Sequence, residues 1–176
     1  MGKMLNLLKE GDRRTTGRVA DAVRAAIGNA NLIDELVELM SHSDPAVRMR
    51  AADALEKATV QHAELLMRHK DYLLDLIEEA SQNEVRWHLA QMLTRLELEA
   101  EEIEGLAHIF TKWFARADSR IVRTSALQGM ADLAHKDASL IEPALKMIER
   151  ALTNSVPALK ARARKLKGPL ERLKTD

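Results

Sequence analysis

Six histidines are the side chains of this sequence best suited to catalysis or metal binding. They lie at positions 42, 62, 69, 88, 108 and 135. None is followed by glutamate and none has glutamate three residues before it, so the zinc motif His-Glu-x-x-His and the di-iron motif Glu-x-x-His are both absent. The sequence also has no Gly-x-Ser-x-Gly, no phosphate-binding loop and no dinucleotide fingerprint. We therefore predict no catalytic residue, no cofactor and no enzymatic activity.

Clustered carboxylates are a second potential source of chemistry. They form one run, made of Glu97, Glu99, Glu101, Glu102 and Glu104. Ca²⁺ and Mg²⁺ sites need ligands that converge from a shaped loop with glycine at its sharp turn. This run leads instead into a helical segment, whose N-terminus favours glutamate through the helix dipole. Because the chain also has no cysteine to supply thiolates, we predict no metal site.

A phrase that recurs at a nearly constant interval organises the rest of the chain. It consists of a capping residue, Val-Arg, and then small and aliphatic residues at helical spacing, at Asp44–Leu55, Asn83–Leu93 and Ser119–Met130. The basic residue of the phrase recurs in steps of 38, 37 and 37 residues, at Arg48, Arg86, Arg123 and Lys160. A weaker copy, Arg18–Val23, precedes Arg50–Leu55 by 32 residues. Such a period is typical of helical solenoids, whose units bury their apolar faces only by stacking.

Each phrase predicts the second helix of a pair, and an apolar stripe before it predicts the first. We expect an all-α, right-handed α–α superhelix of about five helix pairs, forming one domain over residues 1–176. Its approximate units are 1–29, 30–60, 61–98, 99–135 and 136–176. Asp44, Asn83, Ser119 and Asn154 or Ser155 are the predicted helix caps. A short extra turn near Gln61–His69 accounts for the longer step between the second and third units.

The pattern of capped turn, Val-Arg and Ala-Leu at helical spacing resembles the HEAT repeat in its short bacterial style. The resemblance covers nearly the whole chain and implies an armadillo-like solenoid that binds a protein or nucleic acid along a curved surface. It also implies that the recurring basic residue ties turns together through carbonyls and carboxylates. Arg48, Arg86, Arg123 and Lys160 are therefore predicted to be structural.

One helical position further round, the second helices are expected to face the concave surface. The predicted partner-binding residues there are Arg18, Arg50, Asp53, Lys57, Trp87, His88, Gln91, Arg95, Thr124 and Gln128. Tryptophan and arginine contribute a disproportionate share of the energy of protein interfaces. The alternative for Trp87 is that it packs between helices as part of the core.

Charge is unevenly distributed along a chain whose formal net charge is zero. The last predicted helix is basic, and within it Arg162 and Lys165 are candidate contacts for an acidic partner or a nucleic acid. The alternative is a solvated end of the solenoid, because only one turn of the array is basic and no aromatic residue is interleaved.

The leading prediction is a non-catalytic adaptor that docks a protein or peptide on its concave face. The alternative is a nucleic-acid-binding protein distantly similar to the alkylpurine DNA glycosylases, which are built from HEAT-like repeats and act on a damaged nucleotide. Trp87, Arg50, Arg18 and Asp53 are partial ingredients of such a site. A third reading, similarity to the HEAT-repeat bilin lyases, would need a pigment pocket that no residue pattern indicates. With no run long enough to span a membrane and no secretory signal, we expect a cytoplasmic protein without membrane partners.

Overall fold

The structure, a computed structural model, describes residues 2–10 and 16–174. Within these ranges the chain forms ten α-helices and two 3₁₀ helices and no strand, which confirms the predicted all-α fold. The chain divides into two compact units, Met1–Glu97 and Leu98–Asp176, which are described separately. The division into five repeats of one domain remains a prediction.

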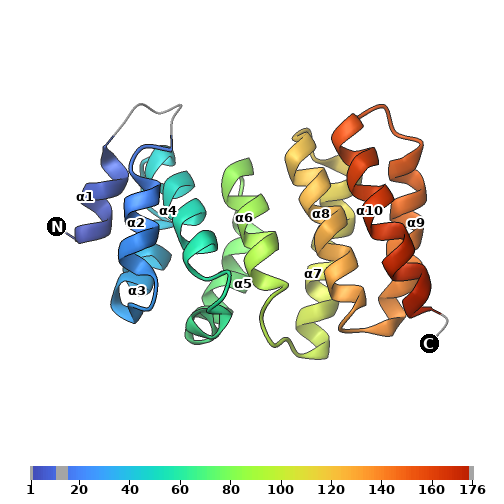
Figure 1. Cartoon of the computed structure of the whole chain (residues 1–176), viewed down its shortest axis with the longest axis horizontal. Helices are drawn as coiled ribbons and strands as arrows, with labels where there is room; N and C mark the ends of the chain where they lie inside the picture. The colour runs from blue at the N-terminus through green and yellow to red at the C-terminus, as the bar shows by residue number, and fades with distance from the viewer. Residues whose placement is uncertain (1, 11–15, 175–176) are drawn as a thin grey trace. The chain divides into compact units, whose positions relative to one another are not determined.

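Unit 1 contains six α-helices and one 3₁₀ helix (Figure 1). Their bounds are α1 Lys3–Lys9, α2 Val19–Ala26, α3 Ala30–Leu39, α4 Pro45–Ala58, η1 Ala63–His69, α5 Lys70–Glu79 and α6 Asn83–Leu93. The second helices pack side by side, with α4 against both α2 and α6, while α1, α3 and α5 each pack on the second helix that follows them. The extra turn predicted near Gln61–His69 is the helix η1.

Unit 2 contains four α-helices and a short 3₁₀ turn. Their bounds are α7 Ala100–Arg116, α8 Arg120–Ala134, η2 Ala138–Leu140, α9 Ile141–Leu152 and α10 Pro157–Leu173. Here α7 packs on α8 and α9 on α10, and the second helices α8 and α10 pack on each other. In each unit, the predicted surface residues lie on or beside the second helices of these pairs.

Small side chains on the second helices allow neighbouring helices to pack closely against them on more than one side. In α4, Ala51, Ala52 and Ala54 have no exposed surface, and the helix packs against α1, α2, α3 and α6. Such close packing leaves polar residues of α4 at the edges of its contacts, and these edges form the candidate site described below.

The starts of α4 and α8 follow the predicted caps, whereas those of α6 and α10 do not. At α10 the cap position belongs to Val156, which makes no capping bond with its side chain, and not to the predicted Asn154 or Ser155. The Asp44 carboxylate accepts a hydrogen bond from the Ala46 amide (2.9 Å), and the Ser119 hydroxyl accepts one from the Val122 amide (3.4 Å). Asn83 was expected to cap α6 but is its first residue, and Gln82 occupies the cap position without a capping bond. The Gln82 side chain is engaged elsewhere, because it bonds to Arg48 and to the Pro45 carbonyl oxygen.

The recurring arginines bind the turns that precede their own helices, as their structural role predicts. Arg48 donates to the carbonyl oxygens of His42 (2.8 Å) and Ser43 (3.1 Å). Arg86 donates to the carbonyl oxygen of Ala80 (2.6 Å), and Arg123 to that of Phe114 (3.0 Å). The Ala80 and Phe114 carbonyl groups lie at the ends of α5 and α7, where carbonyl groups lack a partner within the helix.

No helix within residues 2–10 and 16–174 is both long enough and apolar enough to cross a membrane.

Candidate partner-binding site

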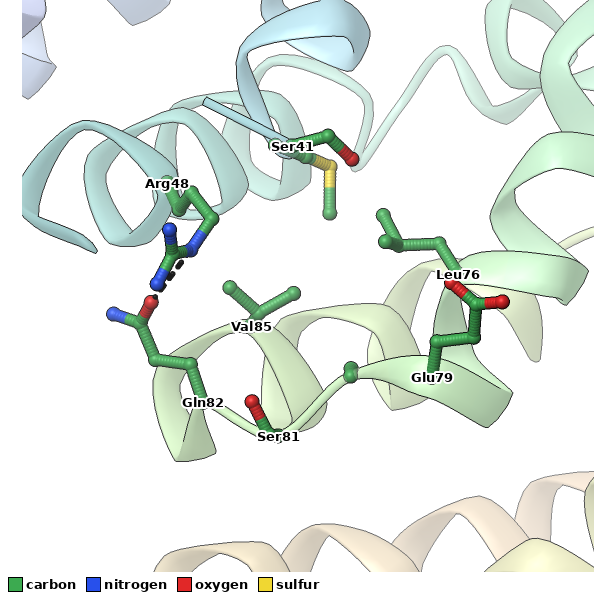
Figure 2. Close-up of a pocket in the computed structure, with 9 residues that line it drawn as sticks. Ser41, Arg48, Leu76, Glu79, Ser81, Gln82 and Val85 are labelled. Atoms are coloured by element: carbon green, nitrogen blue, oxygen red, sulfur yellow. Dashed lines mark hydrogen bonds between the residues drawn. The ribbon is translucent and has the colours of Figure 1, made fainter. Parts of the chain in front are cut away.

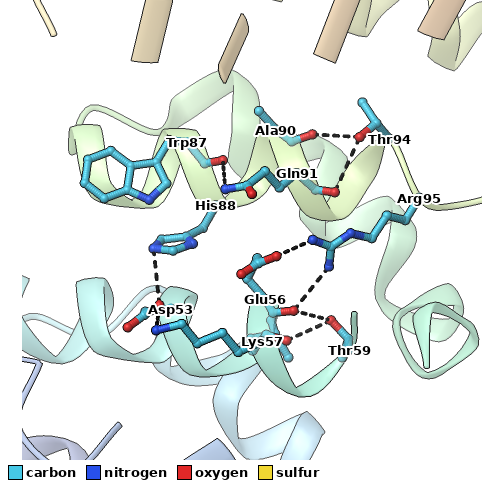
Figure 3. A network of polar contacts seen from close by, with 11 residues as sticks. Asp53, Glu56, Lys57, Thr59, Trp87, His88, Ala90, Gln91, Thr94 and Arg95 are labelled. Carbon is cyan, nitrogen blue, oxygen red and sulfur yellow. Dashed lines mark hydrogen bonds and ion pairs between the residues drawn. The ribbon is translucent and has the colours of Figure 1, made fainter. Parts of the chain in front are cut away.

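The contact between α4 and α6 carries a cluster of polar side chains beside an aromatic ring (Figure 3). We name this cluster the α4–α6 network and define it as Asp53, Glu56, Lys57, Trp87, His88, Gln91 and Arg95. Six of these seven residues were predicted for the partner-binding face. Glu56 was not predicted. Its position, next to Lys57 and one repeat before Arg95, nevertheless indicates an ion pair between neighbouring repeats.

Two ion pairs balance the charges of the network. The Lys57 ammonium lies 2.7 Å from the Asp53 carboxylate, in the (i, i+4) relation that brings side chains together on a helix. Arg95, two residues beyond the end of α6, reaches to α4, where it pairs with the Glu56 carboxylate and donates to the Glu56 carbonyl oxygen (3.2 Å). The two carboxylates are largely buried, whereas the Lys57 side chain is 51% exposed.

Trp87 lies half-buried on α6, in contact with the His88 ring. The two ring centroids are 5.4 Å apart and the planes are tilted by 57°. Gln91, one turn later, donates to the Trp87 carbonyl oxygen at 3.3 Å. The indole therefore keeps part of its surface in solvent, next to charged groups that are already paired.

His88 is a buried polar group of the network. Its side chain is 10% exposed, and its Nε2 lies 3.8 Å from the Asp53 carboxylate, which is too long for a hydrogen bond. Its Nδ1 is buried and has no hydrogen-bond partner among the described residues. Burial lowers the pKa of the imidazole below its ordinary value, and the nearby carboxylates of Asp53 and Glu56 oppose part of that shift.

Arg50 was predicted to face a partner, and the structure corrects this prediction. Its residue surface is only 2% exposed, and its guanidinium donates to the Leu8 carbonyl oxygen at 2.7 Å. Arg50 therefore links α4 to the end of α1 from the inside of unit 1. Asp53 and His88 are each 8% exposed, so they support the surface and present little of themselves to a partner.

Arg18 is exposed at the start of α2, but its charge is already matched. Its guanidinium donates to the Asp21 carboxylate (2.7 Å) and to the Glu10 carboxylate (3.2 Å). Asp21 also pairs with Arg24. Glu10, like Glu56, was absent from the predicted site.

The predicted residues of unit 2 lie on α8 and α10. The Thr124 hydroxyl donates to the Arg120 carbonyl oxygen (2.8 Å) and so is occupied by its own helix. Gln128 donates to Asp132 (2.7 Å) and accepts from Arg162 of α10 (2.7 Å). Lys165 is exposed on α10. The structure thus joins Gln128 and Arg162 by a hydrogen bond within unit 2, while the hydroxyl of Thr124 bonds within its own helix.

The acidic run beginning at Glu97 forms the start of α7, as predicted. Glu99 is the cap residue and forms a capping box with Glu102, whose carboxylate accepts from the Glu99 amide at 2.7 Å. Two of the clustered carboxylates thereby satisfy backbone amides at the helix start.

The chain consists of successive helix pairs with short turns held by a recurring arginine, and its second helices carry a polar face. These features define a helical-repeat protein. A family model described as HEAT repeats matches residues 3–94, more than half of the chain. The chain belongs to the HEAT-repeat family. It matches no curated protein and no solved structure significantly.

Proposed function

We propose that the protein is a non-catalytic adaptor that binds a protein or peptide over the α4–α6 network. HEAT repeats commonly act as scaffolds for protein interactions. The observation that carries the proposal is the half-buried ring of Trp87, set in a surface whose cations are each paired with a carboxylate of the same surface.

Charge pairing favours a protein partner over a nucleic acid at this surface. A phosphate backbone is bound mainly by cations that release counterions, and such cations must be free to meet phosphates. Lys57 and Arg95 are held by Asp53 and Glu56, and Arg18 is held by Asp21 and Glu10. A neutral surface with an accessible indole instead suits a partner that buries an apolar side chain against the ring.

Nucleic-acid binding remains the second candidate, and the observation in its favour lies on α10. Lys167 pairs there with Glu171, and Lys174 pairs with Glu142 of α9. Arg164 and Lys165, however, are exposed and form no ion pair within the described part of the chain. A shift of labelled DNA that weakens steeply with salt, and is lost on Lys165→Glu, would support this candidate.

The adaptor proposal is tested by comparing what three forms of the protein capture from the native cell. Wild type, Trp87→Ala and Trp87→Phe are tagged, treated with nuclease and used for affinity capture with mass spectrometry. We expect a defined protein to be retained by wild type, retained in part by Trp87→Phe, and lost with Trp87→Ala. Melting followed by circular dichroism should differ little among the three, because Trp87 is only half-buried.

The matched control is Ile121→Ala, which removes an exposed apolar side chain (53% exposed) from α8 in unit 2. It should capture the same protein as wild type. Equal capture by wild type and Trp87→Ala would show that the α4–α6 network is not the binding surface. A large fall in the melting temperature of Trp87→Ala would place the ring in the core instead.

A further inference from the structure

A pocket of about 330 Å³ lies between the second and third helix pairs of unit 1, on the side of the turns (Figure 2). Its base is apolar and is formed by Met40, Leu76 and Val85, of which Met40 and Val85 are buried. Arg48 and Gln82 line one wall, and Glu79 lies on the opposite wall (Figure 2). We name it the turn pocket. None of its residues belongs to the α4–α6 network.

The helix η1 accounts for the space. Arg68 and His69 of η1 hold the first half of α3, with Arg68 donating to the Ala30 carbonyl oxygen (2.7 Å) and His69 lying 2.6 Å from the Asp34 carboxylate. α3 packs mainly on α4 and also contacts η1, whereas α5 follows η1 without packing extensively along α3. The ends of α3 and α5 are left apart, and the turn pocket opens between them.

Hydrogen bonds between the two repeats fix the walls of the pocket before any partner arrives. Arg48 donates to Gln82 (3.0 Å), and Gln82 donates to the Pro45 carbonyl oxygen (2.9 Å). On the other side, the hydroxyls of Ser41 and Tyr72 are 2.6 Å apart. A pocket held in this way needs little ordering on binding, which favours affinity.

The charge at the rim is acidic on the side of α5. Glu79 lines the pocket, and Asp75 lies one helical turn before it; both residues are exposed. Neither carboxylate forms an ion pair within residues 2–10 and 16–174. The only cation of the lining, Arg48, already donates to the carbonyl oxygens of His42 and Ser43 as well as to Gln82.

We propose that the turn pocket docks an extended segment of a partner protein, which inserts one aliphatic side chain and places a lysine or arginine against Glu79 and Asp75. The apolar base determines the aliphatic residue. The uncompensated carboxylates determine the cationic neighbour, and the polar rim suits the backbone of the segment. The volume is at the lower end of the range of about 300–1,000 Å³ for small-molecule sites, which fits one side chain better than a cofactor.

The test uses the full chain with methyl-labelled Met, Leu and Val and the peptide Gly-Ser-Lys-Leu-Lys-Ser-Gly as the probe. We expect the methyl signals of Met40, Leu76 and Val85 to shift and saturate during the titration. A peptide with serine in place of the leucine should leave these signals unmoved. A peptide with glutamates in place of both lysines should bind at least about fivefold more weakly, because rim charges change from attraction to repulsion.

A matched pair of variants locates the charge contact on the protein. Glu79→Lys should raise the Kd for the lysine peptide about fivefold or more, whereas Glu78→Lys, also exposed on α5 but outside the lining, should change it less than about twofold. Both positions are exposed, so circular dichroism should report an intact fold for each variant.

Three results would overturn the proposal. The first is an absence of saturable shifts at the three methyl positions, or equal shifts with the serine peptide. The second is an equal loss of affinity in Glu78→Lys and Glu79→Lys, which would indicate general attraction to an acidic helix. The third is a shift of the same methyls with protein concentration alone, which would assign the pocket to a second copy of this chain.

Discussion

The buried imidazole of His88 lies near both acidic and basic side chains. Asp53 and Glu56 of α4 and Glu84 of α6 favour its protonated form, whereas burial and Lys57 disfavour it. Burial is the largest of these effects, so the folded protein holds the pKa of His88 below its ordinary value. The neutral imidazole is then the form that the fold accommodates at neutral pH.

This arrangement predicts that acidification destabilises the protein through His88. The unfolded chain takes up a proton as the pH falls through about 6.5, before the folded chain does, so the free energy of unfolding falls in that window. Wild type should lose up to about 1.4 kcal/mol per pH unit more than His88→Gln between pH 7.5 and 5.5. Urea unfolding at a series of pH values measures the difference. Parallel curves, or a relative gain for wild type in acid, would contradict the prediction.

The neighbouring repeat decides which predicted site residues reach the surface. Arg18 and Arg50 occupy matching places in the sequence repeat, yet the Arg18 side chain is 47% exposed and Arg50 is buried. The difference arises because the Leu8 carbonyl oxygen at the end of α1 accepts a bond from Arg50. Sequence periodicity assigns Lys57 to the same face, and Lys57 is exposed. It contained no information on which copy a preceding helix covers.

At the scale of elements, α7 and α8 approach so closely that one position between them has no room for a side chain. A Cβ on Gly129 of α8 would lie 2.6 Å from the ring of Phe110, which is itself fully buried on α7. By contrast, a Cβ on Gly105 of α7 would meet nothing within 4 Å. A methyl group would therefore fit at Gly105 but would clash at Gly129.

We expect Gly105→Ala and Gly129→Ala to change stability in opposite directions. Gly105→Ala should raise the free energy of unfolding by about 0.5–1 kcal/mol, since alanine loses less backbone entropy in a helix. Gly129→Ala gains the same term, but the displaced Phe110 ring should reverse it and leave a net loss of about 1–2 kcal/mol. Chemical unfolding of the two variants beside wild type measures both values. Stabilisation by Gly129→Ala would show that the ring moves freely and that the contact is not tight.

The helix starts show how far local rules predict the elements. Asp44-Pro45 and Ser119 cap their helices as their residue types require. Asn83 has an equally suitable side chain, but the cap position of α6 belongs to Gln82, which Arg48 holds from the preceding repeat. The contact that holds Gln82 spans 34 residues of the sequence, and no local pattern reports such a contact.

At the scale of the whole molecule, the open question is whether the two compact units unfold together. The sequence repeat continues across their boundary, because Arg86 and Arg123 are 37 residues apart and Arg48 and Arg86 are 38 apart. In a repeat array each unit is stabilised by its neighbours, so we expect one transition for the chain.

Trp113 of α7 reports on unit 2, and Ala51 of α4 lies at the core of unit 1. In a Trp87→Phe background, Ala51→Asp should lower the unfolding midpoint that Trp113 fluorescence records, since a buried unpaired charge removes about 3–5 kcal/mol of stability. The control Ala161→Asp introduces the same carboxylate at an exposed position of α10 and should leave the midpoint almost unchanged. Ala51→Asp could instead leave the Trp113 transition unchanged while part of the helical signal is lost earlier. That result would show that unit 1 unfolds alone. The chain would then consist of two domains, and the prediction of a single solenoid domain would be wrong.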